Sequence, residues 1–388
     1  MARKATVLKR EKAGPSVREL VPALLKWFAV EARDLPWRRT CDPYAVWISE
    51  IMLQQTQVKT VIPFYERWMR TLPTIASVAR ANPAKILKLW EGLGYYTRAR
   101  NLQAAATTIV ELHHGIFPKR YEEVLSLKGI GRYTAGAICS IAFNLPVPIL
   151  DGNVIRVLTR VFGVAENPKE PKTNERLWSL AQNMVQIAAL EDPAKNLPRF
   201  FGAHSSGHCS HLNQSLMELG ALLCSPKQPQ CGLCPLQASC IASQRGLIER
   251  LPNIPRREQP TARQFMALVA HGPAGVLVQQ RPAGVVNAHL WEFPNVEITG
   301  RKLAIRDVGE ELFGLQLRDP THLCTIKHTI TRYRITLEAH QTQLVGKRGL
   351  AAGIGKWCTA ADLKRLAFPS AHRKIANALL KSGFIQRQ

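Results

Sequence analysis

A glutamate interrupts an otherwise apolar segment near the N-terminus. Glu50 is flanked by Trp47, Ile48, Ile51 and Met52, in a stretch with helical character. Most glutamates occupy solvated helix positions, and this pattern is also compatible with that role. In apolar surroundings, desolvation would instead raise the pKa of the carboxyl group and keep a proton available for donation. Glu50 is therefore a candidate general acid.

A pair of glycines marks a second site. Gly129 and Gly131 lie in residues 127–136, which read Leu-Lys-Gly-Ile-Gly-Arg-Tyr-Thr-Ala-Gly. They permit a hairpin too tight for side chains, and a helix that begins beyond Gly131 can direct its free N–H groups at a phosphate oxygen. A Gly-x-Gly pair alone is common in ordinary turns. Here Asp151 follows a Gly/Pro-rich boundary, and the combination predicts a helix-hairpin-helix that binds a DNA backbone.

Four of the nine cysteines are crowded into a short stretch, with the spacing Cys224-x6-Cys231-x2-Cys234-x5-Cys240. Four thiolates from such a stretch can hold a tetrahedral zinc ion or a [4Fe-4S] cluster, and the spacing alone does not distinguish these. The odd total and the absence of an extracellular disulfide pattern favour a reducing compartment.

Residues 192–211 contain further side chains of the metal-ligand type. His204, His208, Cys209 and His211 could bind zinc. Their spacing matches none of the structural zinc patterns, and a flexible polar loop explains the composition equally well. Both interpretations stay open, and the loop could also contact DNA or a partner.

Two other segments have the composition of nucleic-acid contacts. Residues 90–101 combine two glycines with adjacent aromatic residues and basic or amide side chains, although buried core aromatics would look similar. Gln54 and Gln55 follow the segment around Glu50. An amide there could fill the gap left by an extruded base, or could simply lie at the surface.

The composition of the whole chain indicates the partner and the number of domains. A chain of 388 residues with 46% hydrophobic residues is long for one core and predicts two domains. The net charge of +24 favours nucleic acid as the partner, and an anionic membrane surface is the second candidate. No apolar run is long enough to span a bilayer, and the basic start lacks the apolar core of a signal peptide. We therefore expect an intracellular protein that does not bind membranes.

The surrounding elements are predicted from periodicity and from Gly and Pro positions. Ser16 and Glu19 suggest a capping box at the start of an amphipathic helix, and residues 86–223 read mostly as helices. Alternating strands after residue 264, with helices at 302–313 and 370–381, predict a mixed fold. The fold class is an all-α helix-hairpin-helix domain with a cysteine loop, then a smaller α+β domain. The predicted boundaries are 15–244 for the helical domain, 245–263 for a linker and 264–388 for the second domain.

These motifs together resemble a known family. Leu-x-Gly-Ile-Gly-Arg-x-Thr-Ala followed by Ile-Leu-Asp-Gly-Asn-Val resembles the helix-hairpin-helix, Gly/Pro-rich loop, aspartate superfamily of DNA glycosylases. Within it, residues 47–58 look like the catalytic-acid helix of MutY-type adenine DNA glycosylases. The resemblance implies a monofunctional base-excision-repair enzyme that hydrolyses the N-glycosidic bond of adenine mispaired with 8-oxoguanine or guanine in double-stranded DNA. It also implies a [4Fe-4S] cluster on the four cysteines, and a monomer in the cytoplasm or nucleoid if the source is bacterial.

The resemblance assigns roles to individual residues. Glu50 would protonate the flipped adenine at N7, and Asp151 would stabilise the cationic sugar of an oxocarbenium-like transition state. Tyr133 and Asn153 would support the two carboxyl groups. The adenine pocket would be lined or supported by Arg33, Leu35, Trp37, Arg38 and Glu218. The residue that fills the gap in the duplex would be Gln55. The wedge beside the damaged guanine would be Tyr95, with Leu93 nearby, and the hairpin on the DNA backbone would contain Gly129 and Gly131.

Residues 289–297 extend the resemblance to the family's Nudix-like lesion-recognition domain. The carboxylates of residues 306–311 are mis-spaced for Mg²⁺, so a pyrophosphohydrolase is not expected. Where the family carries Phe-Ser-His, this chain has Ile330, Thr331 and Arg332. Thr331 keeps a hydroxyl at the position that contacts 8-oxoguanine, whereas the residues on both sides depart from the pattern.

Two other functions are compatible with parts of the sequence. An endonuclease III-like glycosylase/lyase needs a Schiff-base lysine directly after the hairpin Gly-Arg, where this chain has Tyr133. A non-catalytic lesion-binding protein would not need both Glu50 and Asp151. The products from an adenine:8-oxoguanine duplex, with and without alkali, distinguish all three.

Overall fold

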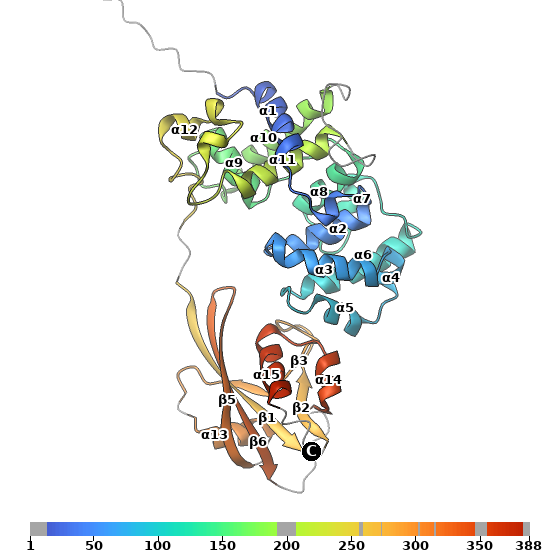
Figure 1. Ribbon diagram of the computed structural model, residues 1–388, viewed down its shortest axis with the longest axis vertical. Coiled ribbons are helices and arrows are strands. Elements are labelled where there is room, and N and C mark those ends of the chain that lie inside the picture. The colour runs from blue at the N-terminus through green and yellow to red at the C-terminus, as the bar shows by residue number, and fades with distance from the viewer. Residues whose placement is uncertain are drawn as a thin grey trace, which may run out of the picture. The chain divides into compact units, whose positions relative to one another are not determined.

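A computed structural model describes most of the chain (Figure 1). The described residues are 14–191, 207–255, 259–272, 274–301, 303–313, 316–345 and 355–382. They divide into two compact units, one of Met1–Met69 with Glu111–Arg256, the other of Arg70–Val110 with Arg257–Gln388. The helical segment Arg70–Val110 thus associates with the C-terminal part of the chain.

Up to residue 245 the described elements are α-helices with a few short 3-10 turns, and strands predominate afterwards. The helices and turns are α1 (Val17–Glu31), η1 (Pro36–Arg38), α2 (Pro43–Leu53), α3 (Val58–Thr71), α4 (Ile75–Ala79), α5 (Pro83–Trp90), α6 (Thr97–Leu112), α7 (Tyr121–Ser126), α8 (Arg132–Phe143), α9 (Gly152–Val161), α10 (Pro171–Leu190), α11 (His208–Leu222), η3 (Cys231–Leu233), η4 (Gln237–Ser239), α12 (Ile241–Arg245), α13 (Ile305–Phe313), α14 (Ala360–Arg365) and α15 (Ser370–Lys381). The strands are β1 (Thr261–Gly272), β2 (Gly275–Gln280), β3 (Trp291–Glu292), β4 (Asn295–Glu297), β5 (Gln316–Ile330), β6 (Tyr333–Val345) and β7 (Lys356–Cys358). Within the described residues, none of the helices has the length and apolar character needed to cross a membrane.

Helix α1 forms as its periodicity predicts, but its start differs. Leu20, Leu24 and Phe28 recur on one face and are buried. Ser16 is the N-cap residue, yet its side chain makes no capping hydrogen bond, so the predicted capping box is wrong. The backbone carbonyl of Ser16 closes the first turn instead, accepting from the N–H groups of Glu19 and Leu20 at 3.0 and 3.1 Å.

Helix α2 is buried from Tyr44 to Met52, on every side rather than along one stripe. Asp42 caps it by accepting a hydrogen bond from the Tyr44 N–H at 3.1 Å, and Pro43 occupies the first position, where no N–H is needed. Glu50 is therefore carried into the core, and the alternative of a solvated helix position is wrong.

The predicted hairpin is present between α7 and α8. Gly129 has φ +82°, a conformation that favours glycine. Leu127 and Ile130 are buried and anchor the turn to the core. Gly131 has an ordinary extended backbone and is the N-cap residue of α8, where no side chain caps the helix. Its missing side chain leaves the N–H groups of α8 accessible.

Helix α11 begins at His208, within the segment that the sequence analysis left open as a polar loop. Its N-terminal turn is capped from a distant segment. Asn144, in the left-handed conformation that ends α8, accepts hydrogen bonds from the N–H groups of Cys209 and Ser210 at 3.0 and 3.3 Å. Residues 208–211 consequently belong to a buried helix, while His204 lies outside the described residues.

The C-terminal strands form one seven-stranded sheet with the order β3-β2-β1-β6-β5, to which β4 and β7 add by pairing with β1 and β2. Strands β1 and β6 are parallel, and the other pairs are antiparallel. Strand β1 begins at Thr261, so the end of the predicted linker already belongs to the sheet.

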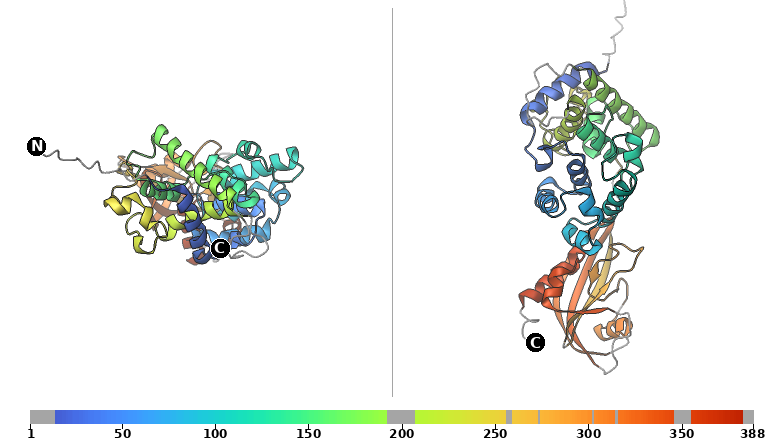
Figure 2. Two further views of the ribbon diagram at one scale, coloured as in Figure 1. Left: turned by 90° about the horizontal axis from the view of Figure 1, so that it is seen from above. Right: turned by 90° about the vertical axis from the view of Figure 1, so that its right-hand side faces the viewer.

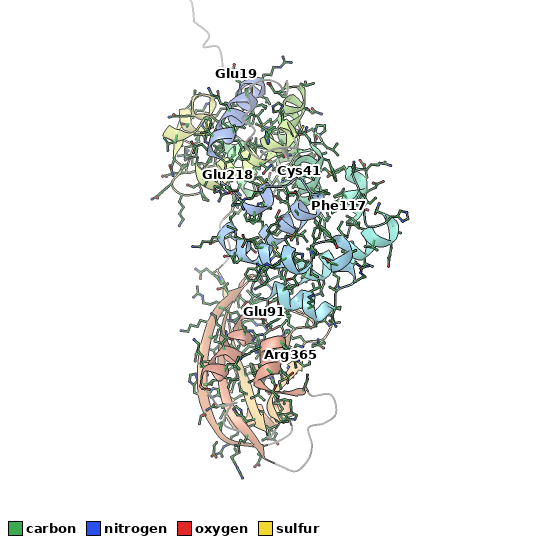
Figure 3. All side chains as sticks on the ribbon, turned by 45° about the vertical axis from the view of Figure 1, so that its right-hand side comes forward. Glu19, Cys41, Glu91, Phe117, Glu218 and Arg365 are labelled. Atoms are coloured by element: carbon green, nitrogen blue, oxygen red, sulfur yellow. The ribbon has the colours of Figure 1, made fainter. Side chains whose placement is uncertain are left out.

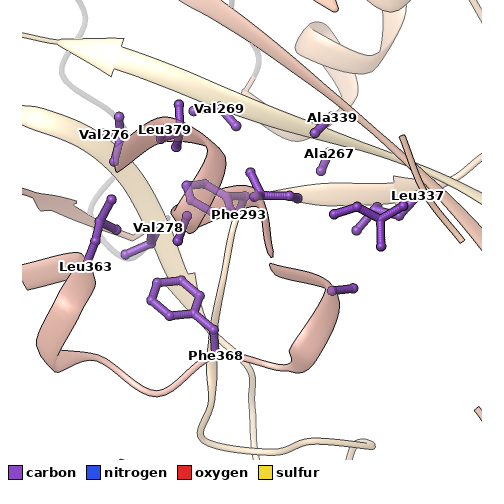
Figure 4. Close-up of a cluster of buried hydrophobic side chains, with 14 of the residues drawn as sticks. Ala267, Val269, Val276, Val278, Phe293, Leu337, Ala339, Leu363, Phe368 and Leu379 are labelled. Carbon is purple, nitrogen blue, oxygen red and sulfur yellow. The ribbon is translucent and has the colours of Figure 1, made fainter. Parts of the chain in front are cut away.

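Helices cover both faces of this sheet, with α13 and α15 on opposite sides (Figure 2). On one face, Val269, Val278 and Phe293 pack against α14, α15 and Phe368 (Figure 4). On the other, Leu268 and neighbouring residues pack against α13. The predicted α+β arrangement is confirmed.

Candidate active site

One cavity of about 530 Å³ lies among the helices of the first unit. This volume is in the usual range for sites that enclose a small organic group. The lining combines apolar residues with three carboxyl groups, two arginines and several amides. Its residues are Arg33, Leu35, Trp37, Arg38, Val46, Ser49, Glu50, Leu53, Gln54, Gln55, Thr56, Val58, Tyr133, Ile141, Leu150, Asp151, Gly152, Asn153, Gln214, Met217, Glu218 and Ala221.

Glu50 presents a buried carboxyl group to this cavity and is 5% exposed. The Tyr133 hydroxyl donates a hydrogen bond to its Oε2 at 2.8 Å. Burial raises the pKa of Glu50 to about 7, and the nearby charge of Asp151 also raises it, while the bond from Tyr133 and the charge of Arg38 oppose the shift. A large fraction of Glu50 therefore carries a proton near neutral pH.

Asp151 begins α9 as its N-cap residue. Its Oδ1 accepts from the Val154 N–H at 2.8 Å, and its Oδ2 accepts from Asn153 Nδ2 at 3.0 Å. Burial raises the pKa of Asp151, whereas these hydrogen bonds and the charge of Arg156 act against that rise. Because more donors stabilise the charged form of Asp151 than that of Glu50, the geometry favours Glu50 as the protonated member of the pair.

A charged network closes one side of the cavity. Glu218 on α11 is 1% exposed and accepts hydrogen bonds from both Arg33 and Arg38, at distances from 2.7 to 3.0 Å. Burial alone would raise the pKa of Glu218, but the hydrogen bonds from the two arginines outweigh it and lower the pKa to about 2. Glu218, labelled in Figure 3, is therefore ionised, and its hydrogen bonds fix two guanidinium groups at the cavity wall.

The cavity brings together many of the residues that the sequence and its resemblance indicated. Those that line it are Arg33, Leu35, Trp37, Arg38, Glu50, Gln55, Tyr133, Asp151, Asn153 and Glu218. Gln55 is exposed and has φ +56°, directly after α2. Its amide is positioned at the surface, as a residue that fills a gap in the duplex requires.

Other predicted contact residues do not line this cavity. Gly129 and Gly131 form the hairpin, and Tyr95 is 48% exposed with φ +47° on the loop after α5. Leu93 on the same loop is buried at 5% exposure, so its side chain packs inward. Thr331, with φ +50°, occupies the turn between β5 and β6, where the register pairs Ile330 with Tyr333.

Sequence analysis missed several residues of the cavity wall. Gln214 accepts a hydrogen bond from Arg38 Nε at 3.1 Å, and the Met217 sulfur lies 3.2 Å from the Tyr133 hydroxyl. On α11, Gln214 lies four positions before Glu218 and three before Met217, so it shares a helix face with both. That spacing from Glu218 was the available signal for Gln214.

A hydrogen-bonded path joins Asp151 to the cysteine-rich loop. Asn153 donates to Asp151, and its own Oδ1 accepts from Arg156 Nη2 at 2.8 Å. Arg156 Nε also donates to the Cys224 carbonyl at 2.6 Å. The cysteine loop therefore helps to hold the start of α9, where the catalytic carboxylate candidate lies.

The four cysteines of this loop lie near one another. Burial raises the pKa of Cys234 to about 11, and the charges of Cys224, Cys231 and Cys240 contribute to the rise. The buried Arg160 donates to the Cys224 sulfur at 3.4 Å, a hydrogen bond that suits a thiolate. Within the described part of the chain, no three His, Cys, Asp or Glu side chains converge on a single metal ion.

The described histidines of residues 192–211 have another explanation. His208, Cys209 and His211 are buried on α11, and the His211 ring lies 6.1 Å from that of Phe28. Burial lowers the pKa of His211 to about 4, with a further contribution from His208. These three side chains pack as part of the helical core.

A helix-hairpin-helix beside a cavity with two buried carboxyl groups defines a base-excision DNA glycosylase. In agreement, residues 48–183 match the HhH-GPD superfamily of base excision DNA repair proteins, and residues 265–378 match the NUDIX domain. Adenine DNA glycosylases from Rattus norvegicus and Homo sapiens are both 34% identical over 91% of this chain, covering 76% and 72% of their own lengths. The chain belongs to the adenine DNA glycosylase family. Among solved structures, a thermostable thymine-DNA glycosylase aligns over 59% of this chain and 97% of its own, with 26% identity and a TM-score of 0.49.

Proposed function

We propose that this adenine glycosylase acts on adenine mispaired with 8-oxoguanine or guanine in double-stranded DNA, and that it is monofunctional. The observation that carries the proposal is the pair of carboxyl groups at one cavity, with Glu50 raised to a pKa of about 7 and Asp151 held at a helix N-terminus. The cavity volume suits one extruded base.

In the proposed mechanism, Glu50 donates its proton to N7 of the extruded adenine. The bond between C1′ and N9 then breaks, and its electron pair leaves with the neutral base. Asp151 as a carboxylate stabilises the positive charge that develops on the sugar. Water adds to C1′ and releases a proton, which completes hydrolysis without a covalent enzyme intermediate.

The residues around the two carboxyl groups hold this arrangement. Tyr133 fixes Glu50 by donating to Oε2, and Asn153 fixes Asp151. Glu218 holds Arg33 and Arg38 through hydrogen bonds. Their guanidinium groups are therefore preorganised as donors to a base that enters the cavity. Leu35 and Trp37 supply apolar wall, and Gln55 fills the gap in the duplex.

The absence of a suitable amine supports a monofunctional enzyme. A lyase step needs a lysine that can form a Schiff base with C1′. No lysine is found among the described residues that line the cavity, and Tyr133 occupies the position after the hairpin where such a lysine would be expected. Abasic product should therefore stay intact until alkali is added.

We also propose that Cys224, Cys231, Cys234 and Cys240 hold a [4Fe-4S] cluster. The four sulfur donors fit such a group, because they lie near enough for their charges to affect one another and four cysteines are the ligand set of a [4Fe-4S] cluster. When bound, the cluster would cross-link the loop and supply a one-electron redox couple. Lys227 and Arg245 on this loop are exposed and would face a phosphate backbone.

The remaining contacts concern the duplex itself. The net charge of +24 supports binding to DNA, with the hairpin at Gly129 and Gly131 on the backbone, and we propose that the protein binds as a monomer. Tyr95, with Leu93 packed beneath its loop, would wedge beside the base opposite adenine, and Thr331 would contact 8-oxoguanine. Such a substrate supports an intracellular location with the chromosome, which is the cytoplasm or nucleoid if the source is bacterial.

A panel of duplexes tests the proposal. Excess enzyme is incubated with adenine opposite 8-oxoguanine, guanine, cytosine or thymine, and strands are analysed with and without alkali. We expect adenine release only from the first two, with strand breaks only after alkali. Equal release from a normal adenine:thymine pair would refute the mispair assignment, and breaks without alkali would refute the monofunctional one.

A further inference from the structure

The loop between α5 and α6 presents Tyr95 in a constrained conformation. Tyr95 is 48% exposed and has φ +47°, while the next residue, Tyr96, is 3% exposed. Gly92 and Gly94 also have positive φ angles, of 112° and 69°. A left-handed conformation at a tyrosine is unfavourable by itself, so the surrounding contacts must maintain it.

One set of contacts comes from α6 itself. Arg98 Nη2 donates to the carbonyl groups of Leu93 and Gly94 at 3.1 and 3.2 Å, and its guanidinium lies 5.6 Å from the centre of the Tyr95 ring. Trp90 Nε1 also donates to the Gly94 carbonyl, at 3.1 Å. These bonds fix the backbone on both sides of Gly94.

A second set comes from the C-terminal part of the same unit. The Oε1 atom of Glu91 accepts hydrogen bonds from the Phe368 N–H and from Arg373 Nε, both at 2.8 Å. Lys88 donates to the other carboxylate oxygen. The Glu91 and Arg373 side chains are only 12% and 17% exposed, so solvent screens this ion pair weakly. Figure 3 marks Glu91 at the end of α5.

The partners of Glu91 are rigid. Phe368 is fully buried in the core that joins the sheet to α14 and α15. Its carbonyl also accepts a hydrogen bond from the Tyr96 hydroxyl at 3.1 Å. Phe368 therefore donates one hydrogen bond to Glu91 and accepts one from Tyr96, and Tyr95 lies between these two anchored residues.

We propose that Glu91 is a positioning residue through which the C-terminal sheet core sets the orientation of Tyr95. This inference rests on the proposed function, in which Tyr95 contacts the base opposite adenine. Glu91 lies outside the cavity that holds Glu50 and Asp151 and takes no part in the cleavage step. When Glu91 loses its charge, the loop is no longer fixed. Affinity for the damaged base then falls, while cleavage of bound adenine continues.

A merely structural role for Glu91 predicts a different pattern. Loss of general stability would weaken binding to all duplexes alike. Loss of Tyr95 positioning weakens binding mainly where the opposite base is 8-oxoguanine. The ratio of affinities for adenine:8-oxoguanine and adenine:guanine duplexes therefore separates the two explanations.

The test compares Glu91→Gln with wild type and with Glu111→Gln. Glu111 is an exposed glutamate near the end of α6, so its substitution removes the same charge without touching the loop. We expect Glu91→Gln to reduce the affinity ratio about five- to tenfold, the size of one net hydrogen bond. Single-turnover cleavage of the adenine:guanine duplex stays within about twofold of wild type, as expected from loss of discrimination alone. Glu111→Gln leaves the ratio unchanged.

Hydrogen exchange in the absence of DNA provides an independent measurement. The Phe368 amide donates to Glu91, so peptides that contain it should exchange faster in Glu91→Gln than in wild type. Arg373→Gln should produce a similar change in the affinity ratio, and the double variant should add little to either single variant because they share one contact.

The outcomes distinguish this proposal from the function it rests on. A clear wild-type preference for 8-oxoguanine with an unchanged ratio in Glu91→Gln overturns the positioning role alone, and so does unchanged exchange at Phe368. A wild-type protein that binds the two duplexes equally overturns the proposed lesion preference, and this inference with it. If Glu91→Gln lowers the affinity for both duplexes equally, the result supports the structural explanation and overturns the positioning role.

Discussion

Replacing Tyr133 by phenylalanine should move the pH dependence of adenine excision. The Tyr133 hydroxyl donates to Glu50 Oε2 at 2.8 Å and lowers the pKa of that carboxyl group, which burial holds at about 7. A hydrogen bond to a charged group contributes about 1.5 kcal/mol, which corresponds to about one pKa unit. The pKa of Glu50 in Tyr133→Phe should therefore rise by about one unit.

The sign of the effect follows from the role of Glu50. Because the acid must be protonated, kcat/KM falls as pH increases through the pKa of Glu50 in the free enzyme. In wild type the fall is centred near pH 7, and in Tyr133→Phe it moves to higher pH. At pH 8 the variant loses less of its own maximal activity than wild type does.

The assay is adenine release from dilute adenine:8-oxoguanine duplex with excess enzyme, measured from pH 5.5 to 9 at constant ionic strength. The control is Tyr121→Phe, because Tyr121 begins α7 and does not line the cavity. A profile that moves to lower pH, or one that does not move while the variant remains folded, would refute the assignment of the pH-dependent group to Glu50.

Three further predictions concern stability, DNA binding and lesion preference. Glu218→Gln should lower the free energy of unfolding at pH 7 by about 3 kcal/mol, because two guanidinium groups lose a buried anionic partner. Since the pKa of Glu218 is lowered to about 2, chemical denaturation should show this difference shrinking as pH falls below the ordinary glutamate pKa. Gly129→Ala forces an alanine to φ +82° and should weaken binding to all duplexes alike, by about 1 kcal/mol in a fluorescence titration. Thr331→Ala should reduce the preference for adenine:8-oxoguanine over adenine:guanine by about 0.5–1.5 kcal/mol in competition binding, and an unchanged ratio would mean that 8-oxoguanine is contacted elsewhere.

Local patterns in the sequence predicted an element well where the residues of that segment alone determine its conformation. The spacing of Leu20, Leu24 and Phe28 gives the buried face of α1, and the glycines of residues 127–136 give the hairpin. The capping box at Ser16 failed because a backbone carbonyl can close a first turn as well as a side chain can. The residue types alone therefore do not distinguish a first turn closed by a side chain from one closed by a backbone carbonyl.

Features that depend on distant segments could not be derived from local pattern. The hydroxyl group that donates to Glu50 belongs to Tyr133, 83 residues away, and the first turn of α11 is capped by Asn144, 65 residues before Cys209. The bond between Glu91 and the Phe368 amide spans 277 residues. The family resemblance supplied Glu218 as a pocket residue, but it did not identify the contacts that hold it.

The central claim is that Glu50 supplies the proton for adenine release at a cavity where Asp151 stabilises the sugar. The most direct test is the single-turnover rate of free adenine release from an adenine:8-oxoguanine duplex by wild type and by Glu50→Gln, with duplex affinity measured in parallel. Glutamine keeps the shape and can still accept from Tyr133, but it has no transferable proton. We predict that affinity is retained and that the rate falls by about 10²–10⁴-fold, the usual contribution of a general acid. Adenine release by Glu50→Gln within a few-fold of wild type would contradict this mechanism.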